Sequence, residues 1–113
     1  MKFSQDLRNF YAESGKERGG FITKDGMVVE VENVHSDKEN FFMFSCDDLN
    51  KLEDEDVVAT FHTHPGKSSN LSTDDYDSFV NWENLLHFII GKDKITCYKV
   101  SERGTVIIEP IGD

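Results

Sequence analysis

The sequence predicts one compact domain that mixes α-helices with β-strands. Its 113 residues are enough for a single hydrophobic core and too few for a second domain. Apolar residues recur with helical spacing in about three segments and with strand-like spacing in about six others, and turn-forming residues separate these segments. No repeat or linker divides the chain, so we expect one domain over residues 1–113. The residue pattern by itself is compatible with both a βαβ arrangement and an α+β sheet.

The first half of the chain predicts an amphipathic helix, a β-hairpin and a third strand. Apolar side chains before Gly15 share one helical face, and this glycine provides a stop. Asp25-Gly26 between apolar segments is a strong signal for a tight hairpin turn. The expected elements are a helix over 3–14, two strands on either side of 24–26, and a strand over 41–44.

The second half predicts two helices and four strands. Ser45 followed by Asp48 is a capping pattern and predicts a short helix that ends near Leu52. Residues 57–64 are typical of a buried strand, which Pro65 ends because proline has no N–H donor. The other expected elements are a helix from Ser72 to about Leu86 and strands near 87–90, 94–100 and 104–109.

The charge balance bears on partners more than on the reaction. The net charge is -10, from 22 acidic and 12 basic residues, so the overall field should repel nucleic-acid phosphates. We therefore expect no nucleic-acid partner and favour a neutral or cationic protein segment. Acidity is also a common means of staying soluble, and that interpretation is open.

Cysteine usage and hydropathy favour a cytoplasmic protein without a membrane span. Cys46 and Cys97 form no CxxC pattern, so we expect two small buried core residues rather than a disulfide or a cysteine zinc site. The N-terminus lacks the apolar segment of a signal peptide, and His87 interrupts the longest apolar run.

Two histidines, an aspartate and a serine form a candidate catalytic metal site. Side chains of a strand alternate between its faces, so His62 and His64 point the same way, about 6.6 Å apart at Cα, and Thr63 points away. Asp75, in the first turn of the helix after a seven-residue loop, can supply a third ligand. Three such ligands leave the fourth position of a tetrahedral zinc for water, which is typical of catalytic sites. Ser72 is the candidate donor to an oxyanion.

Each part of this cluster also has an ordinary explanation. Ser72 with Asp75 is a good helix start, in which the serine caps the helix and the carboxylate lies near its positive end. A His-x-His pattern has many chance occurrences. Barrel hydrolases with this pair need a much longer chain, and a cupin site would need a glutamate shortly after His64, where the sequence has Pro65-Gly-Lys-Ser-Ser. The order and spacing of the four residues are more informative than any one of them.

The cluster resembles the JAMM motif of the JAB/MPN metalloproteases, which is His-x-His, seven residues, Ser, two residues, Asp. The sequence contains His62-Thr-His64, seven residues, Ser72, two residues and Asp75, and so matches all four positions. Thr63 stands where the family often has serine, and the long insertions that bind ubiquitin in eukaryotic relatives are absent. The chain is most similar to the minimal bacterial and phage versions.

The resemblance also selects a general base. The family has a glutamate in a Glu-x-x-Gly-aliphatic context before an early strand, and the sequence has Glu17-Arg-Gly-Gly20-Phe-Ile there. Without the resemblance, Glu13 would be an equal candidate. Residues 31–34 followed by 41–44 are similar to the "Asn-x-x-x…Phe" segment that precedes the motif in prokaryotic JAB domains, so the likeness covers nearly the whole chain.

The resemblance implies a fold, a cofactor and a reaction. The fold is α+β, a JAB/MPN-like (cytidine-deaminase-like) domain with a curved mixed sheet and about three helices. His62, His64 and Asp75 would bind Zn²⁺, Glu17 would activate water, and Ser72 would stabilise the oxyanion. The reaction would be hydrolysis of a peptide or isopeptide bond, in a precursor or after the C-terminal tail of a ubiquitin-like protein. A phage tail-assembly or non-catalytic zinc-binding module is the alternative, and another hydrolytic reaction, such as deamidation, is a third.

The remaining histidines and aromatic residues are expected to be structural. His35 and His87 lie outside the motif, so we expect neither to bind the metal. Trp82 and the nine phenylalanines are expected to form core rather than a substrate cage.

Overall fold

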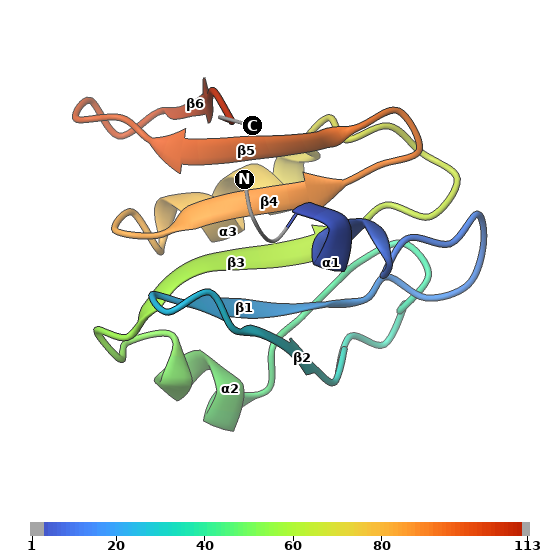
Figure 1. Ribbon diagram of the computed structural model, residues 1–113, viewed down its shortest axis with the longest axis horizontal. Coiled ribbons are helices and arrows are strands. Elements are labelled where there is room, and N and C mark those ends of the chain that lie inside the picture. The colour runs from blue at the N-terminus through green and yellow to red at the C-terminus, as the bar shows by residue number, and fades with distance from the viewer. Residues whose placement is uncertain (1–3, 112–113) are drawn as a thin grey trace.

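The computed structural model describes residues 4–111 and contains three helices and six strands (Figure 1). The helices are α1 (Ser4–Arg8), α2 (Cys46–Lys51) and α3 (Thr73–Val80). The strands are β1 (Gly19–Thr23), β2 (Val28–Val31), β3 (Val57–Thr63), β4 (Leu86–Ile90), β5 (Ile95–Val100) and β6 (Val106–Glu109).

All six strands form one mixed sheet in the order β2-β1-β3-β4-β5-β6. Only β3 and β4 run parallel, and α3 lies in the connection between them, as a parallel pair requires. The other neighbouring strands pair antiparallel. The described chain is thus an α+β domain, which agrees with the predicted fold class at this level.

The central strands are covered on both faces, so they carry side chains into two different layers (Figure 1). Phe61 of β3 and Ile90 of β4 pack with Leu7 of α1 on one face. Phe79 of α3 packs on Ile89 on the other face. Because strand side chains alternate, His62 lies on the α3 face, opposite to Phe61.

The predicted hairpin and the first cap are confirmed. β1 and β2 pair antiparallel around Gly26, whose φ of 89° lies in the left-handed region that glycine tolerates. Ser45 caps α2 and accepts a hydrogen bond from the Asp48 N–H at 3.1 Å. The strands expected in the second half also form, with small shifts at their ends.

Two helices are shorter than their apolar patterns predicted. α1 ends at Arg8, and the chain then tightens so that Phe10 N–H donates to Leu7 and Tyr11 N–H to Arg8. Phe10 and Tyr11 still pack on the core, but from turns rather than from helix, and residue 3, where the predicted helix begins, lies outside the described residues. α3 likewise ends at Val80 instead of near Leu86. Turns with hydrogen bonds between residues i and i+3 continue the chain to β4.

Two further expectations were wrong. Residues 41–44 form no strand, because both backbone groups of Met43 bond to Asn33 and Val34 instead of to a partner strand. Cys46 is exposed at the start of α2, whereas Cys97 is buried as expected. None of the described helices has the length and apolar character needed to cross a membrane.

Candidate metal centre

The candidate centre lies where β3 ends beside the entry to β1. In the antiparallel ladder Gly19 pairs with His62, and beyond it the Thr63 N–H donates to the Arg18 carbonyl at 2.8 Å. Arg18 N–H in turn donates to the Thr63 hydroxyl at 2.9 Å. This pairing engages Thr63 with the neighbouring strand and brings Glu17 alongside the histidines.

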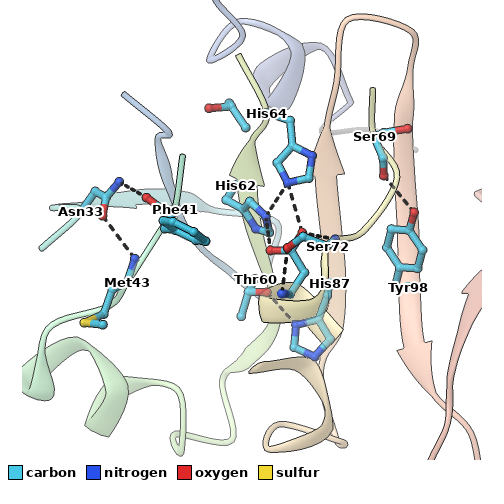
Figure 2. Close-up of polar contacts among 12 residues, drawn as sticks. Asn33, Phe41, Met43, Thr60, His62, His64, Ser69, Ser72, His87 and Tyr98 are labelled. Atoms are coloured by element: carbon cyan, nitrogen blue, oxygen red, sulfur yellow. Dashed lines mark hydrogen bonds and ion pairs between the residues drawn. The ribbon is translucent and has the colours of Figure 1, made fainter. Parts of the chain in front are cut away.

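The rings of His62 and His64 point toward one another (Figure 2), and Asp75 contacts both of them. The Nε2 atoms of His62 and His64 lie 3.2 Å apart. His62 Nε2 is 3.0 Å from Asp75 Oδ1, and His64 Nε2 is 3.1 Å from Asp75 Oδ2. Two imidazole nitrogens and a carboxylate, all directed to one point, are a donor set that fits a divalent ion such as zinc.

A backbone contact orients His64 for ligation. Its Nδ1 lies 2.9 Å from the Ser68 carbonyl oxygen, which can only accept a hydrogen bond. The proton of a neutral His64 is therefore on Nδ1, which leaves the Nε2 lone pair available to a metal ion. Such an outer partner commonly fixes the tautomer of metal-binding histidines.

Asp75 is held by the start of α3. Its Oδ2 accepts from the Ser72 backbone N–H at 2.9 Å, and its own N–H donates to the Ser72 hydroxyl at 3.1 Å, forming a capping box. Burial by itself would raise the pKa of Asp75. The two imidazoles and the Ser72 N–H outweigh burial, so the pKa lies well below its ordinary value.

Glu17 is the fourth member of the group and is only 4% exposed. One carboxylate oxygen and the ligand nitrogens of His62 and His64 all lie within 4.8 Å of one another, so these three buried residues can also hold a metal ion. Burial raises the pKa of Glu17, and the neighbouring histidines offset only part of this effect. Glu13, the other candidate base, is exposed.

Ser72 has the capping role that its sequence context suggested. Its hydroxyl oxygen accepts from Asp75 N–H, which uses a lone pair and leaves the hydroxyl proton free to donate. Ser72 also lines a cleft next to the metal ligands. Capping and donation to a substrate are therefore compatible.

The cleft has a volume of about 400 Å³ and lies between the 40–44 segment and α3. Its walls include Phe42, whose ring stacks 6.2 Å from His62 between centroids. A Cβ atom at Gly19 would lie 2.8 Å from that ring, so glycine is needed for its close approach. Phe42 and Trp82 line the cleft, whereas they were expected to form only core.

His87 and His35 make other contacts. His87 Nε2 lies 3.0 Å from the Trp82 carbonyl oxygen and Nδ1 lies 2.7 Å from the Thr60 hydroxyl, which engages both ring nitrogens. Burial lowers the pKa of His87 to about 4. His35 Nδ1 accepts from the Asp37 N–H at 2.9 Å, although His35 lines the same cleft as His62.

Sequence reasoning missed residues whose contribution is a backbone group or a packing position. Ser68 contributes through its carbonyl, and no side-chain pattern encodes that contact. Asn33, 2% exposed, donates to the Glu17 carbonyl at 2.9 Å, and the sequence signal for it was the likeness of residues 31–34 to the segment that precedes the motif, which gave it no role.

The sequence matches no family model, and no curated protein matches it significantly.

Proposed function

We propose that this protein is a zinc-dependent hydrolase of peptide or isopeptide bonds, of the JAMM type. The observation that carries the proposal is the convergence of His62, His64 and Asp75 within 3.2 Å of one another, beside the buried Glu17. These residues come from a strand end, a helix start and a loop that precedes another strand. A packed domain does not need such a convergence for stability alone, because it gathers desolvated charge at one point.

His62, His64 and Asp75 would hold the zinc ion. Zinc in such a site lowers the pKa of water and polarises a carbonyl oxygen. The Ser68 carbonyl and the Ser72 N–H orient two of the ligands before any metal binds. Such preorganisation lowers the cost of assembling the site.

Glu17 would act as the general base and then as the acid. Its buried carboxylate accepts a proton from the attacking water at one oxygen and delivers that proton to the nitrogen of the leaving amine. Burial raises the pKa of Glu17 in the metal-free chain, and the charge of a bound zinc ion would act against that rise.

Ser72 would stabilise the tetrahedral intermediate. Its free hydroxyl proton can donate to the oxygen that becomes negative when water adds to the carbonyl. The capping box holds this serine in place, so the donor needs little reorganisation.

The cleft fits a segment of extended chain. Within the described residues, the backbone groups of Phe42 and Phe44 have no hydrogen-bond partner, whereas Met43 is bonded on its other side to Asn33. In Figure 2, Asn33 and the His62 site lie on opposite sides of the segment that contains Met43. An extended substrate, such as the C-terminal tail of a ubiquitin-like protein, would pair with this free edge by strand addition.

The test is cleavage of a panel of tail-linked isopeptides and linear peptides by the zinc-loaded protein. We expect bond cleavage by the wild type and a loss of about 100-fold or more in kcat for Glu17→Gln. Glu13→Gln is the matched control, because this nearby glutamate is exposed. Full activity of Glu17→Gln would remove the base from the mechanism, and an uncut panel with zinc bound would favour a non-catalytic binding module.

A further inference from the structure

A buried asparagine links the proposed base to the cleft wall. Asn33 follows β2, is 2% exposed, and lies between Glu17 and the 40–44 segment. A fully buried amide costs free energy unless its donors and acceptor are satisfied, and all of them are satisfied here.

The amide nitrogen of Asn33 bonds to the backbone of Glu17 and also to the cleft wall at Phe41. Nδ2 donates to the Glu17 carbonyl at 2.9 Å and to the Phe41 carbonyl at 2.9 Å, with a longer contact of 3.3 Å to the Lys38 carbonyl. Glu17 N–H donates to that same Lys38 carbonyl at 2.7 Å. Both backbone groups of Glu17, its N–H and its carbonyl, are thus bonded to the segment from Asn33 to Lys38.

The amide oxygen of Asn33 holds the wall side. Oδ1 accepts from the His35 N–H at 3.1 Å. It also accepts from the Met43 N–H at 3.2 Å, as Figure 2 shows. Carbonyls surround one end of the amide and N–H groups the other, so only one orientation of the side chain satisfies the network. Ionised aspartate would keep the acceptor half, lose the donor half and set its second oxygen against the carbonyls.

We propose that Asn33 is a positioning residue, which sets the distance of Glu17 from the scissile bond through one amide shared with the substrate wall. The inference rests on the proposed function, since it assigns Asn33 a part in that reaction. Misplacement of a catalytic group by about 1 Å can cost 100-fold in rate. Loss of the hydrogen bond between Asn33 and Glu17 should therefore have a measurable effect on kcat.

Two substitutions of Asn33 distinguish the effect of its donor bonds from that of its acceptor bonds. With the best-cleaved peptide of the panel, Asn33→Asp should lower kcat by about 10–100-fold and leave KM within about twofold, because the wall loses its bond at Phe41 but keeps the bond at Met43, which lies next to the free edge. Asn33→Ala, which loses both halves, should also raise KM. Asn81→Asp is the matched control, because its amide makes an exposed bond to the Asp77 carbonyl, remote from the base.

A double-mutant cycle tests whether Asn33 acts through Glu17. On the Glu17→Gln background, Asn33→Asp should cost less than about twofold in kcat, since the group it positions is already gone. If the losses in kcat of the two single variants multiply in the double variant, Asn33 does not act through Glu17, and the assignment is overturned. If Asn33→Asp does not fold, Asn33→Gln, which moves both halves of the amide by one methylene, carries the same comparison.

Amide hydrogen exchange gives a readout independent of activity. In Asn33→Asp, the Glu17 N–H should exchange faster while the His35 and Met43 N–H groups stay protected. Unchanged exchange at Glu17 would overturn the proposal even if the wild type cleaves nothing. An inert wild type with the expected exchange pattern would instead contradict the proposed function alone.

Discussion

The residues of the candidate centre combine structural and chemical tasks. Asp75 and Ser72 cap α3 through reciprocal bonds, and both also face the ligand cluster or the cleft. His64 is tied to Ser68 through one ring nitrogen and faces Asp75 through the other. A substitution at any of these three residues therefore needs a control variant that separates a loss of stability from a loss of function.

The two helix-capping serines provide such a control. Ser72→Ala should lower the free energy of unfolding by about 1 kcal/mol through the lost cap, and kcat by about 100-fold or more through the lost oxyanion donor. Ser45→Ala removes an equivalent cap from α2, whose hydrogen bond is also 3.1 Å long. We expect a similar loss of stability and unchanged kcat in that variant, measured by urea unfolding and peptide cleavage. Equal kcat in the two variants would leave Ser72 with only its structural role.

Asp75→Asn tests the proposed metal ligand. The asparagine oxygen can still accept from the Ser72 N–H, so α3 should keep most of its cap. Zinc affinity should fall by about 100-fold or more, since even an outer-shell partner is worth about 10–100-fold. Asp74→Asn, an exposed neighbour in the same helical turn, should bind zinc like the wild type in a chelator competition assay. Comparable affinity in both variants would place the metal elsewhere.

Among the elements, the segment between β2 and α2 departs most from its sequence pattern. Its apolar run over 41–44 predicted a strand, but Asn33 and Val34 provide the bonds that a partner strand would have supplied. The rings of Phe42 and Phe44 still pack edge to face, with centroids 4.9 Å apart. The same side chains thus form a cleft wall instead of a core strand.

Gly19 of β1 lies close to the Phe42 ring of this wall, so a larger side chain at position 19 should disturb the wall. In Gly19→Ala, the new Cβ would lie 2.5 Å from the Phe61 carbonyl oxygen and 2.8 Å from the Phe42 ring. We expect a loss of about 1–3 kcal/mol in unfolding free energy and displaced Phe42 ring resonances in NMR spectra. Gly15→Ala meets no atom within 4 Å, so its strain from a φ of 102° should destabilise the chain without moving that ring. Unmoved Phe42 resonances in Gly19→Ala would contradict the packing argument.

For the whole molecule, the buried His87 predicts how stability depends on pH. Burial lowers its pKa to about 4 in the folded chain, against about 6.5 when unfolded. Between these values the unfolded state binds more protons, so stability should fall as pH drops from about 6.5 toward 4, by about 3 kcal/mol in all. His87→Gln keeps a donor for the Trp82 carbonyl but does not titrate. The difference between wild type and this variant in urea unfolding should shrink with falling pH, and a constant difference would contradict the assignment.

The sequence was most informative where local chemistry decides the outcome. Asp25-Gly26 formed its turn, Ser45 and Ser72 capped their helices, and the alternation of β3 directed His62 away from Phe61. The sequence was least informative about helix ends. Phe10 and Trp82 pack inward from short turns, and they could do so equally well from a continued helix. Apolar spacing records which side is buried, and it does not distinguish these conformations.

The sequence by itself determined the candidate ligands, since the order and spacing of His62, His64, Ser72 and Asp75 are visible in the chain. Only the tertiary structure decided that Glu17 is buried beside them, and that Asn33 and Ser68 hold the base and a ligand in place. The physical reason is the range of the interactions. Capping and strand alternation act within a few residues, whereas the position of Glu17 depends on pairing between β1 and β3, far apart in the sequence.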